Sequence, residues 1–527
     1  MSVSKIVTAG DGTSSKLLRK LGNKSVYKIF EREIDALAMY TLDQYRGTSV
    51  TCRYAIPPKF AHQESNADFM GIIHAAIAET ILKHPVLQVG IIDAESMKPM
   101  WVQLQRLDMN QHVTWHFLDA ATNSDDASQN LTASEVDGKF SDLEVRPGWR
   151  ILILCQETTS TMEINFTWNH PHADGVSGKI FQEDLCQSLN TQTFYHKRMQ
   201  QQSGSFVVEL PQDPRLPPPI EEVCKLPLSL GYMAKMAWAE FGPASLAWTR
   251  PCLAKWAPFQ LSPYKTRFRA FTVEKDSLSN ILLACRQHKI TLTGLLHGLA
   301  LVSLSSQLDQ ETAPGFKSGT TVDMRRFLPS NPLNYPWLEA TRTMSNYVTL
   351  MAHQFDSSLL SQIRSRISPK DKTLPLPVDV IQQVWSISAR VRGEIKQKLD
   401  MGLKNDPVGA MKLVKDWRQQ MNDTAKRPRQ FSWWVTGVGV LEHRSQLDNR
   451  TPSRPDSSLP EDTWVVNRAQ FALSNETTAA AFNISPMTAA GQRLTVGISW
   501  QDCICDVQMG NRLMKDLQQW LGQIAGL

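Results

Sequence analysis

The sequence predicts a mixed α/β protein of two domains, each a sheet flanked by helices. Short runs rich in β-branched and aromatic residues alternate with longer stretches in which apolar residues recur at helical spacing. The 527 residues exceed what one hydrophobic core normally serves. Ten of the 29 prolines fall between Pro211 and Pro263, and they separate two parts that are each long enough to bury a core.

The proline-rich stretch sets the domain boundaries that we expect. Proline has no backbone N–H and disfavours helix in the residue before it, and Pro217, Pro218 and Pro219 follow one another directly. We therefore expect this stretch to lie extended on the surface. The predicted division is an N-terminal domain over residues 1–205, a crossover linker over 206–265 and a C-terminal domain over 266–527.

In the N-terminal domain, strands are predicted where β-branched and aromatic residues cluster. Helices are predicted where apolar residues recur every three or four positions, as in the helix that Ser65 and Asp68 would cap. The resulting elements are strands over 50–56, 86–92, 149–155 and 161–168, a helix beginning at 65 and a helix over 176–189.

The C-terminal domain repeats this mixture and closes with a helix. Its uncharged stretch from Ile290 to Leu308 holds five Ser/Thr, a His and a Gln, so we interpret it as a buried helix and not as a membrane span. The predicted elements are strands over 267–273, 317–323, 431–441, 465–473, 478–485 and 493–500 and helices over 276–287, 292–308, 379–398 and 508–522.

Composition and charge exclude several classes of partner. Lys and Arg exceed Asp and Glu by only five over the whole chain, which is too dilute for a nucleic-acid-binding surface. The eight cysteines lack the paired spacings of a zinc site, so we expect reduced thiols and no metal. The N-terminus has no apolar signal-peptide core and the C-terminus no targeting motif, which predicts a cytoplasmic protein.

Two segments leave alternatives open. Residues 228–248 are rich in aromatic residues, Met and Leu, so they could lie in a membrane interface, although such segments more often pack across a protein's own domains. Residues 390–430 carry 11 Lys/Arg against five Asp/Glu. They could attract the phosphates of a nucleotide, or they could be solvated faces of amphipathic helices.

The segment after the strand 161–168 carries the candidate chemistry. The apolar residues of this strand share one face, and continuing the alternation puts His170 on that face. Pro171, His172, Asp174 and Gly175 follow, just before the predicted helix. Working residues of α/β proteins usually lie at such strand-to-helix junctions.

An imidazole with a pKa of about 6.5 is mostly neutral at pH 7 and can take a proton from a hydroxyl or an amine that attacks a carbonyl. Asp174 could hold the tautomer of His170, or it could turn away and pair with an arginine. His172 is a rival base, since it would share the parity of His170 if the strand continued past Pro171. In a structural alternative, the histidine and the aspartate only satisfy backbone groups at the helix start.

The run Asn169-His-Pro-His-Ala-Asp-Gly175 resembles the HHxxxDG motif of the superfamily that includes chloramphenicol acetyltransferase, plant BAHD acyltransferases and the condensation domains of nonribosomal peptide synthetases. Leu18-Arg-Lys-Leu-Gly22, followed by residues 40–45, resembles the opening of the fungal alcohol O-acetyltransferase branch. Residues 290–297 are similar to the helix that opens its second domain, and Val322-Asp-Met-Arg-Arg326 is similar to the arginine-bearing strand that follows. These matches span nearly the whole chain.

The resemblance implies a role for each motif residue. The family's base maps to His170, and its aspartate, here Asp174, forms a structural salt bridge with the arginine that maps to Arg325. Asn169 stands where the family has a first histidine, a departure that the alcohol acetyltransferase and plant branches tolerate and that weighs against a condensation domain. The motif ends at Gly175. The implied fold is two chloramphenicol-acetyltransferase-like domains with a tunnel between them and His170 near its middle.

Acyl transfer also needs a donor for the negative charge that develops on the carbonyl oxygen. Thr436 is our candidate, in Val435-Thr-Gly-Val-Gly439, where the family tends to read Ser-Asn-x-Gly. Gly437 breaks that pattern, so a plain strand with permissive glycines is equally consistent with this stretch. The DFGWG motif of the plant branch is absent.

The implied function is acyl-CoA-dependent O-acyltransfer, with acetyl as the expected group and a small apolar alcohol or secondary metabolite as the hydroxyl acceptor. Acetyl-CoA or another acyl-CoA is then a co-substrate, no bound cofactor is expected, and we expect a monomer. Two alternatives stay open. One is a condensation-like enzyme that uses a carrier-bound donor or forms an amide, and the other is a non-catalytic binding module of the same fold.

Overall fold

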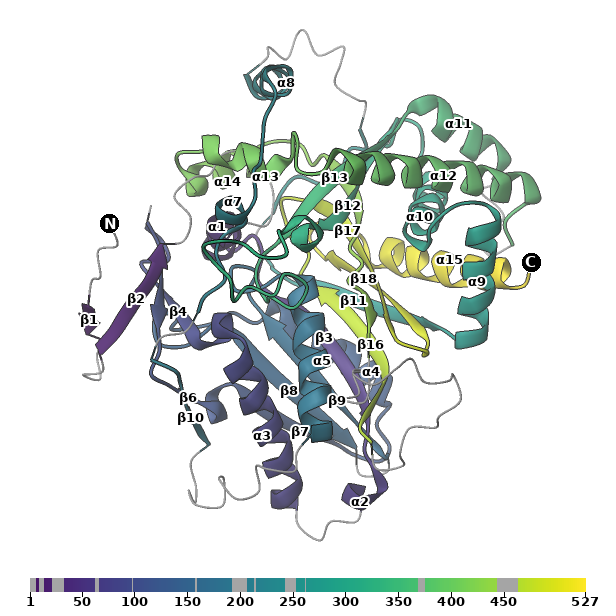
Figure 1. Ribbon diagram of the computed structural model, residues 1–527. Helices are drawn as coiled ribbons and strands as arrows, with labels where there is room; N and C mark the ends of the chain where they lie inside the picture. The colour runs from purple at the N-terminus through teal and green to yellow at the C-terminus, as the bar shows by residue number, and fades with distance from the viewer. Residues whose placement is uncertain are drawn as a thin grey trace.

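Two large sheets, each covered by helices, form the body of the protein (Figure 1), which confirms the predicted α/β class. The computed structural model describes residues 6–8, 14–20, 33–61, 66–96, 98–156, 159–191, 206–212, 215–241, 253–260, 262–367, 375–442 and 463–527.

The sheet of the N-terminal half carries the motif. Its elements are β3 (Thr48–Ala55), β7 (Val113–Leu118), β8 (Trp149–Gln156), β9 (Thr161–Trp168) and β16 (Val465–Leu473), with α3 (Asn66–Lys83) and α5 (Gly175–Thr191). The strand order is β16-β3-β9-β8-β7, antiparallel except for β7, which runs parallel to β8. Helices α3 and α5 lie side by side over one face (Figure 1).

Strand β9 is buried on both faces. Phe166, on the apolar face, stacks on Phe181 of α5 with ring centroids 3.9 Å apart. Helix α4 (Ser124–Asp137) covers the polar face, where Asn165 donates a hydrogen bond to Thr132 of that helix at 3.2 Å. Packing from both sides fixes the direction in which His170 leaves the strand.

The sheet of the C-terminal half has the order β11-β18-β17-β14-β12-β13, with β15 beside β17. Helix α10 is buried along most of its length, as predicted for the uncharged stretch. The elements are β11 (Thr266–Val273), β12 (Phe316–Asp323), β13 (Val348–Phe355), β14 (Phe431–Val435), β15 (Gly439–Leu441), β17 (Ala480–Ala489), β18 (Leu494–Gln501), α9 (Lys275–Gln287), α10 (Leu292–Gln307), α12 (Val378–Met401) and α15 (Val507–Ala525).

Strand β16 departs from the predicted division of the chain. The prediction assigns residues 465–473 to the C-terminal domain, but β16 pairs antiparallel with β3, from Leu473 opposite Thr48 to Val465 opposite Ala55. The chain therefore completes the N-terminal sheet before it returns to the C-terminal sheet as β17. A strand can be recognised from local pattern, whereas its partner is a tertiary choice.

The predicted strand over 86–92 is too long. Pro85 begins a 3-10 turn over Pro85–Gln88, so β4 covers only Val89–Ile92. Because the proline ring fixes φ near the value of a helical first turn, it favours this turn over an extended start.

The crossover linker is not uniformly extended, in contrast to the prediction. Strand β10 (Val207–Glu209) pairs with β6 (Arg106–Asp108), and α8 (Leu230–Phe241) is a helix that stands away from both large sheets (Figure 1). No proline occurs between Pro227 and Pro243, so this part of the linker is free to form a helix.

The other described elements connect and cover the sheets. Their bounds are β1 (Ile6–Thr8), β2 (Ser14–Lys20), β5 (Met100–Gln103), α1 (Glu33–Thr41), α2 (Pro58–Ala61), α7 (Ile220–Val223), α11 (Ser357–Arg366), α13 (Pro407–Ala410), α14 (Trp417–Ala425) and the 3-10 helices η2 (Met109–Gln111), η4 (Met324–Phe327) and η5 (Met411–Leu413). Within the described ranges no single helix is long and apolar enough to cross a membrane, although α9 and α10, bent by 93°, pass that test as a pair.

Candidate active site

The motif lies in the turn between the end of β9 and the start of α5. Its backbone is held at both ends: the N–H of Asn169 donates to the carbonyl of Gly148 at 2.8 Å, and the indole of Trp168 donates to the carbonyl of Ala173 at 2.8 Å. A Cβ at Gly175 would lie 2.6 Å from a side-chain carbon of Val438. A glycine is therefore required where the N-terminus of α5 approaches the C-terminal half.

His170 is 7% exposed and faces a residue that the sequence interpretation did not single out. The side-chain Nδ2 of Asn346 lies 3.0 Å from the backbone carbonyl oxygen of His170 and 3.1 Å from ring atom Nδ1. The ring of Tyr45 packs 5.4 Å from the imidazole, centroid to centroid. Burial lowers the pKa of His170 below 6.5, and it does so against a hydrogen bond from the ring to its own carbonyl and the charge of Asp174.

His172, the rival base, is fully enclosed. Its Nδ1 lies 2.6 Å from Oδ1 of Asn169, and its Nε2 lies 3.2 Å from the carbonyl oxygen of Val89. Burial lowers the pKa of His172 to about 4. Since both ring nitrogens are occupied by protein groups, the geometry favours His170 over His172 as the base, and it gives Asn169 a part in holding His172.

Asp174 and Arg325 form the ion pair that the resemblance implies. Nη1 of Arg325 lies 2.7 Å from Oδ2 of Asp174, and Nη2 lies 3.0 Å from Oδ1. The carboxylate also accepts hydrogen bonds from the backbone and hydroxyl of Ser177, both at 2.8 Å, and from the N–H of Tyr347 at 2.9 Å. Burial alone would raise the pKa of Asp174, but Arg325 and these donors hold it below 3.8.

The hydrogen bonds of Asp174 bear on the two roles considered from the sequence. Within the described part of the chain, its carboxylate accepts hydrogen bonds from Ser177, Arg325 and Tyr347 and none from the imidazole of His170. Arg325 also binds the segment before β13: its Nε donates to the carbonyl of Thr343 at 2.9 Å and its Nη2 to the carbonyl of Ser345 at 3.0 Å. The geometry is that of a brace and not of a group that sets the tautomer.

Sequence reasoning missed the segment Ser345-Asn346-Tyr347, which supplies partners to both His170 and Asp174. It lies directly before β13, 176 residues after His170. The only signal available in the sequence is a polar Ser-Asn pair directly before a β-rich run, whereas the Asn-His pair of the motif directly follows one.

Thr436 is buried just after β14. Its Oγ1 lies 3.0 Å from Oγ of Ser485, and its N–H donates to the carbonyl of Ile484 at 2.9 Å. In a pair of hydroxyls one O–H is used between them, which leaves the second O–H available to another acceptor. Val438, two residues on, is the side chain that crowds Gly175, so this stretch borders the start of α5.

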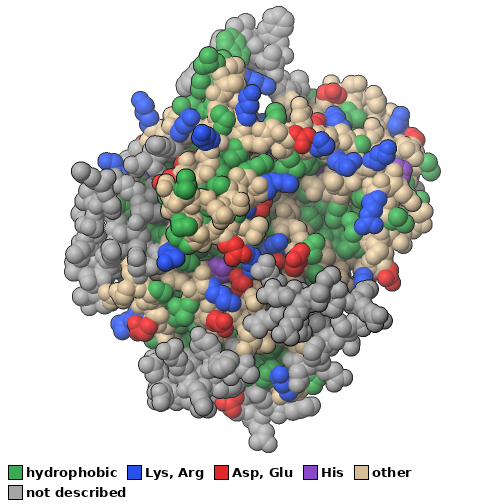
Figure 2. All heavy atoms as spheres, viewed as in Figure 1, with side chains coloured by type: hydrophobic (Ala, Val, Ile, Leu, Met, Phe, Trp, Pro, Cys, Tyr) green, Lys and Arg blue, Asp and Glu red, His purple; other side chains and the backbone are tan. Residues whose placement is uncertain are grey.

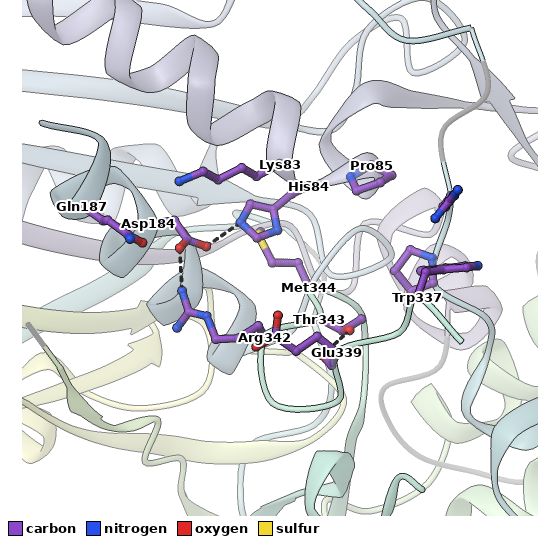
Figure 3. Close-up of a pocket in the computed structure, with 12 residues that line it drawn as sticks. Lys83, His84, Pro85, Asp184, Gln187, Trp337, Glu339, Arg342, Thr343 and Met344 are labelled. Carbon is purple, nitrogen blue, oxygen red and sulfur yellow. Dashed lines mark hydrogen bonds and ion pairs between the residues drawn. The ribbon is translucent and has the colours of Figure 1, made fainter. Parts of the chain in front are cut away.

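A pocket of about 590 Å³ opens where α3, α5, the linker and the segment before Asn346 meet (Figure 3). His84, Asp184 and Arg342 point toward one another on its wall, with Nε2 of His84 2.8 Å from Oδ2 of Asp184 and Nη2 of Arg342 2.8 Å from Oδ1. Figure 2 shows acidic and basic side chains, with a histidine among them, gathered near the centre of the face in view. The pocket is lined by Lys83, His84, Pro85, Asp184, Gln187, Arg215, Pro217, Trp337, Glu339, Arg342, Thr343 and Met344.

Among the described residues, no group of three or more His, Cys, Asp or Glu could hold a metal ion. The seven described cysteines are all free. The arrangement offers one buried neutral imidazole, a braced carboxylate and a hydroxyl pair, which suits proton transfer from an attacking nucleophile.

Comparison with known proteins points to one family. The model of the alcohol acetyltransferase family matches residues 107–365. A probable alcohol acetyltransferase, FCK4, of Fusarium pseudograminearum (strain CS3096) is 25% identical over 498 residues, 92% of this chain and 92% of the relative. Another, crmB of Aspergillus fumigatus (strain ATCC MYA-4609 / CBS 101355 / FGSC A1100 / Af293), is 21% identical over 448 residues, 84% of this chain and 87% of the relative.

Solved structures share the fold. The trichothecene 15-O-acetyltransferase TRI3 from Fusarium sporotrichioides superposes with a TM-score of 0.65 at 14% identity, over 98% of this chain and 97% of that one. The first condensation domain of the calcium-dependent antibiotic synthetase gives a TM-score of 0.54 at 11% identity, over 94% of both chains. These structures confirm the fold. The family model and the two named relatives confirm the resemblance to the fungal alcohol O-acetyltransferase branch and identify this chain as an acyltransferase.

Proposed function

We propose that the protein is an acyl-CoA-dependent O-acetyltransferase that acetylates a hydroxyl of a small apolar alcohol or secondary metabolite, with His170 as general base. The observation that carries the proposal is a buried imidazole, its pKa below 6.5, held at the end of β9 beside a braced carboxylate. The relatives named as alcohol acetyltransferases support the acetyl group and the hydroxyl acceptor.

In the proposed reaction, Nε2 of His170 takes the proton of the acceptor hydroxyl while its oxygen attacks the thioester carbonyl carbon. The carbonyl oxygen becomes negatively charged in the tetrahedral intermediate. When the intermediate collapses, the C–S bond breaks and the sulfur leaves with the proton that His170 carried, as the CoA thiol. Burial favours the neutral imidazole that the first step requires.

Thr436 remains the proposed donor to the negatively charged oxygen. Its hydroxyl oxygen lies 3.0 Å from that of Ser485. One of the two O–H groups donates within this pair, and the other is free to donate to the oxyanion. Asp174 and Arg325 are proposed to brace the site, and Gly175 to let α5 approach it.

The pocket of Figure 3 is the proposed place for the polar end of the acyl-CoA donor. Lys83 and Arg215 line it and can attract phosphates, while Trp337 gives a flat apolar wall. Its lining runs through Met344, two residues before Asn346, which contacts His170. A tunnel between the two domains, with His170 near its middle, is part of this proposal.

Incubation of the purified protein with acetyl-CoA and a panel of small hydroxylated compounds tests the proposal. The expected result is release of free CoA thiol together with an acetyl ester identified by mass spectrometry, both absent with His170→Ala. Turnover only with an acetyl group on a carrier-protein arm, or only with amine acceptors, would favour the condensation-like enzyme. Binding of acetyl-CoA without turnover of any compound would favour the non-catalytic module.

A further inference from the structure

We infer that Asn346 is a positioning residue for His170 and that the Asp174–Arg325 pair acts on His170 through Asn346. The inference rests on the proposed role of His170 as base, and it concerns how the imidazole is held with the correct nitrogen free.

The contact between the two side chains is close and buried. Asn346 is 6% exposed, and its Nδ2 lies 3.0 Å from the carbonyl oxygen of His170 and 3.1 Å from Nδ1. Asp174 is the charged group that acts on His170, and Tyr45 packs against its ring. Asn346 is thus the polar side chain that meets the imidazole directly within the described part of the chain.

The two contacts of Asn346 with His170 bear on which tautomer the imidazole adopts. Nδ1 is the ring nitrogen next to its own backbone, so when it carries the proton it can donate to the carbonyl of His170. The N–H of Asn346 donates to the same oxygen, which has two lone pairs. With Nδ1 protonated, Nε2 carries the lone pair that a general base needs.

The other contact of the amide, from Nδ2 to Nδ1 at 3.1 Å, favours the opposite tautomer, because Nδ1 must then accept the hydrogen bond. Nε2 would then hold the proton and could not accept one from a substrate hydroxyl. Placement of Nδ2 against the carbonyl therefore matters, because a small shift of Asn346 changes which acceptor it meets. The Oδ1 atom of Asn346 is buried with no hydrogen-bond partner in the described structure. Only the Nδ2 end of the amide is therefore satisfied, and it is satisfied by His170.

The brace fixes Asn346 from both sides along the chain. On one side, the carbonyl of Ser345 accepts hydrogen bonds from Arg325 at 3.0 Å and from Ser177 at 2.9 Å. On the other, the N–H of Tyr347 donates to Asp174 at 2.9 Å. The carboxylate and the arginine thus hold the backbone on either side of Asn346, and this is the route by which the inferred effect reaches the imidazole.

The experiment compares Asn346→Ala with Asn190→Ala. Asn190 is a control outside the site, because its side chain also bonds backbone groups, at Cys186 and Trp464, but at the far end of α5 and in an exposed position. We expect Asn346→Ala to lower kcat about 10²-fold with little change in KM, since misplaced catalytic groups cost about this much. Asn190→Ala should keep its kcat and change only the melting temperature.

Asn346→Asp adds a readout that a structural role would not move. A carboxylate beside Nδ1 favours the imidazolium, so the pKa of His170 should rise and the acidic limb of the pH–kcat/KM profile should move to higher pH. In a double-mutant cycle, Asn346→Ala should cost little further kcat in an Asp174→Asn background, because the two residues act in series.

Each outcome separates the two proposals. If His170→Ala keeps the wild-type rate, the proposed base and this inference both fall. If His170→Ala is inactive but Asn346→Ala keeps its kcat, or loses kcat only in proportion to the folded protein lost, the inference alone is wrong. Additive losses in the cycle would show that the brace does not act through Asn346.

Discussion

The carboxylate of Asp174 and the guanidinium of Arg325 lie 2.7 Å apart, Oδ2 to Nη1, although 151 residues separate them in the chain. Both side chains are almost fully buried, at 1% and 2% exposed. The pair links the residue directly before α5 to the 3-10 helix η4 that follows β12, so it connects the motif to the C-terminal half of the chain.

Removal of one member of this pair should destabilise the protein strongly. Asp174→Ala and Arg325→Ala each leave a buried charge without its partner, which should lower the free energy of unfolding by about 3 to 5 kcal/mol and reduce activity. The double variant should lose much less than the sum of the two, as chemical denaturation would measure, because the residues share one interaction. An Asp174→Ala protein with an unaltered melting temperature would contradict this expectation.

The two histidines of the motif should respond in opposite ways. His170→Ala should lower kcat about 10²- to 10⁴-fold with little loss of stability, the usual contribution of acid–base catalysis. His172→Ala should instead lower the free energy of unfolding by about 1 to 3 kcal/mol, because it leaves Asn169 without its hydrogen-bond partner in the core. Steady-state kinetics and denaturation of both variants check this. A fast His170→Ala enzyme beside an inactive, stable His172→Ala enzyme would reverse the assignment.

His172 should also make stability fall in mild acid. Its pKa is about 4 in the folded protein against an ordinary value of 6.5, so between pH 6.5 and 4 the unfolded chain binds a proton that the folded protein does not. The free energy of unfolding should therefore fall with falling pH in this window, by up to about 3 kcal/mol from this group. Urea titrations of wild type and His172→Gln at several pH values measure it, and equal slopes for the two proteins would count against it.

Glu476 should produce the opposite slope. Burial, reinforced by Asp35, raises the pKa of Glu476 to about 8 from 4.5, so the folded protein holds a proton that the unfolded chain releases between those values. Stability from this group is lost as pH rises through that range. Glu476→Gln should match wild type near pH 5 and melt at a higher temperature by pH 8, whereas Glu339→Gln on the surface should not. A pH-independent difference in melting temperature would argue against a protonated Glu476.

The pocket of Figure 3 gives a test of the donor. Lys83→Ala and Arg215→Ala should each raise the KM for acetyl-CoA, by up to roughly 10-fold, with kcat retained, because each removes a charge that can bind phosphate. Lys139→Ala, at an exposed lysine just after α4 that does not line the pocket, is the matched control. The effect should shrink at high salt. Unchanged KM values in both pocket variants would place the donor elsewhere.

The sequence by itself determined the class, most of the strands and helices, and the frame of the motif. These features are local. Alternation in residues 161–168 gives β9, the next apolar stripe gives α5, and together they place His170, Asp174 and Gly175 at one junction. The ion pair with Arg325 was reachable only by resemblance, since no local pattern joins residues 151 positions apart.

Only the tertiary structure decided which groups meet the motif. Asn346 contacts His170 from 176 positions away, and β16 leaves the C-terminal half to pair with β3, because hydrogen-bonding edges and buried faces are matched across the whole chain and not along it. The same reason separates the two histidines. Parity gave both the same face, but the fold surrounded His172 with Asn169 and Val89 and placed His170 against the amide of Asn346 and the ring of Tyr45.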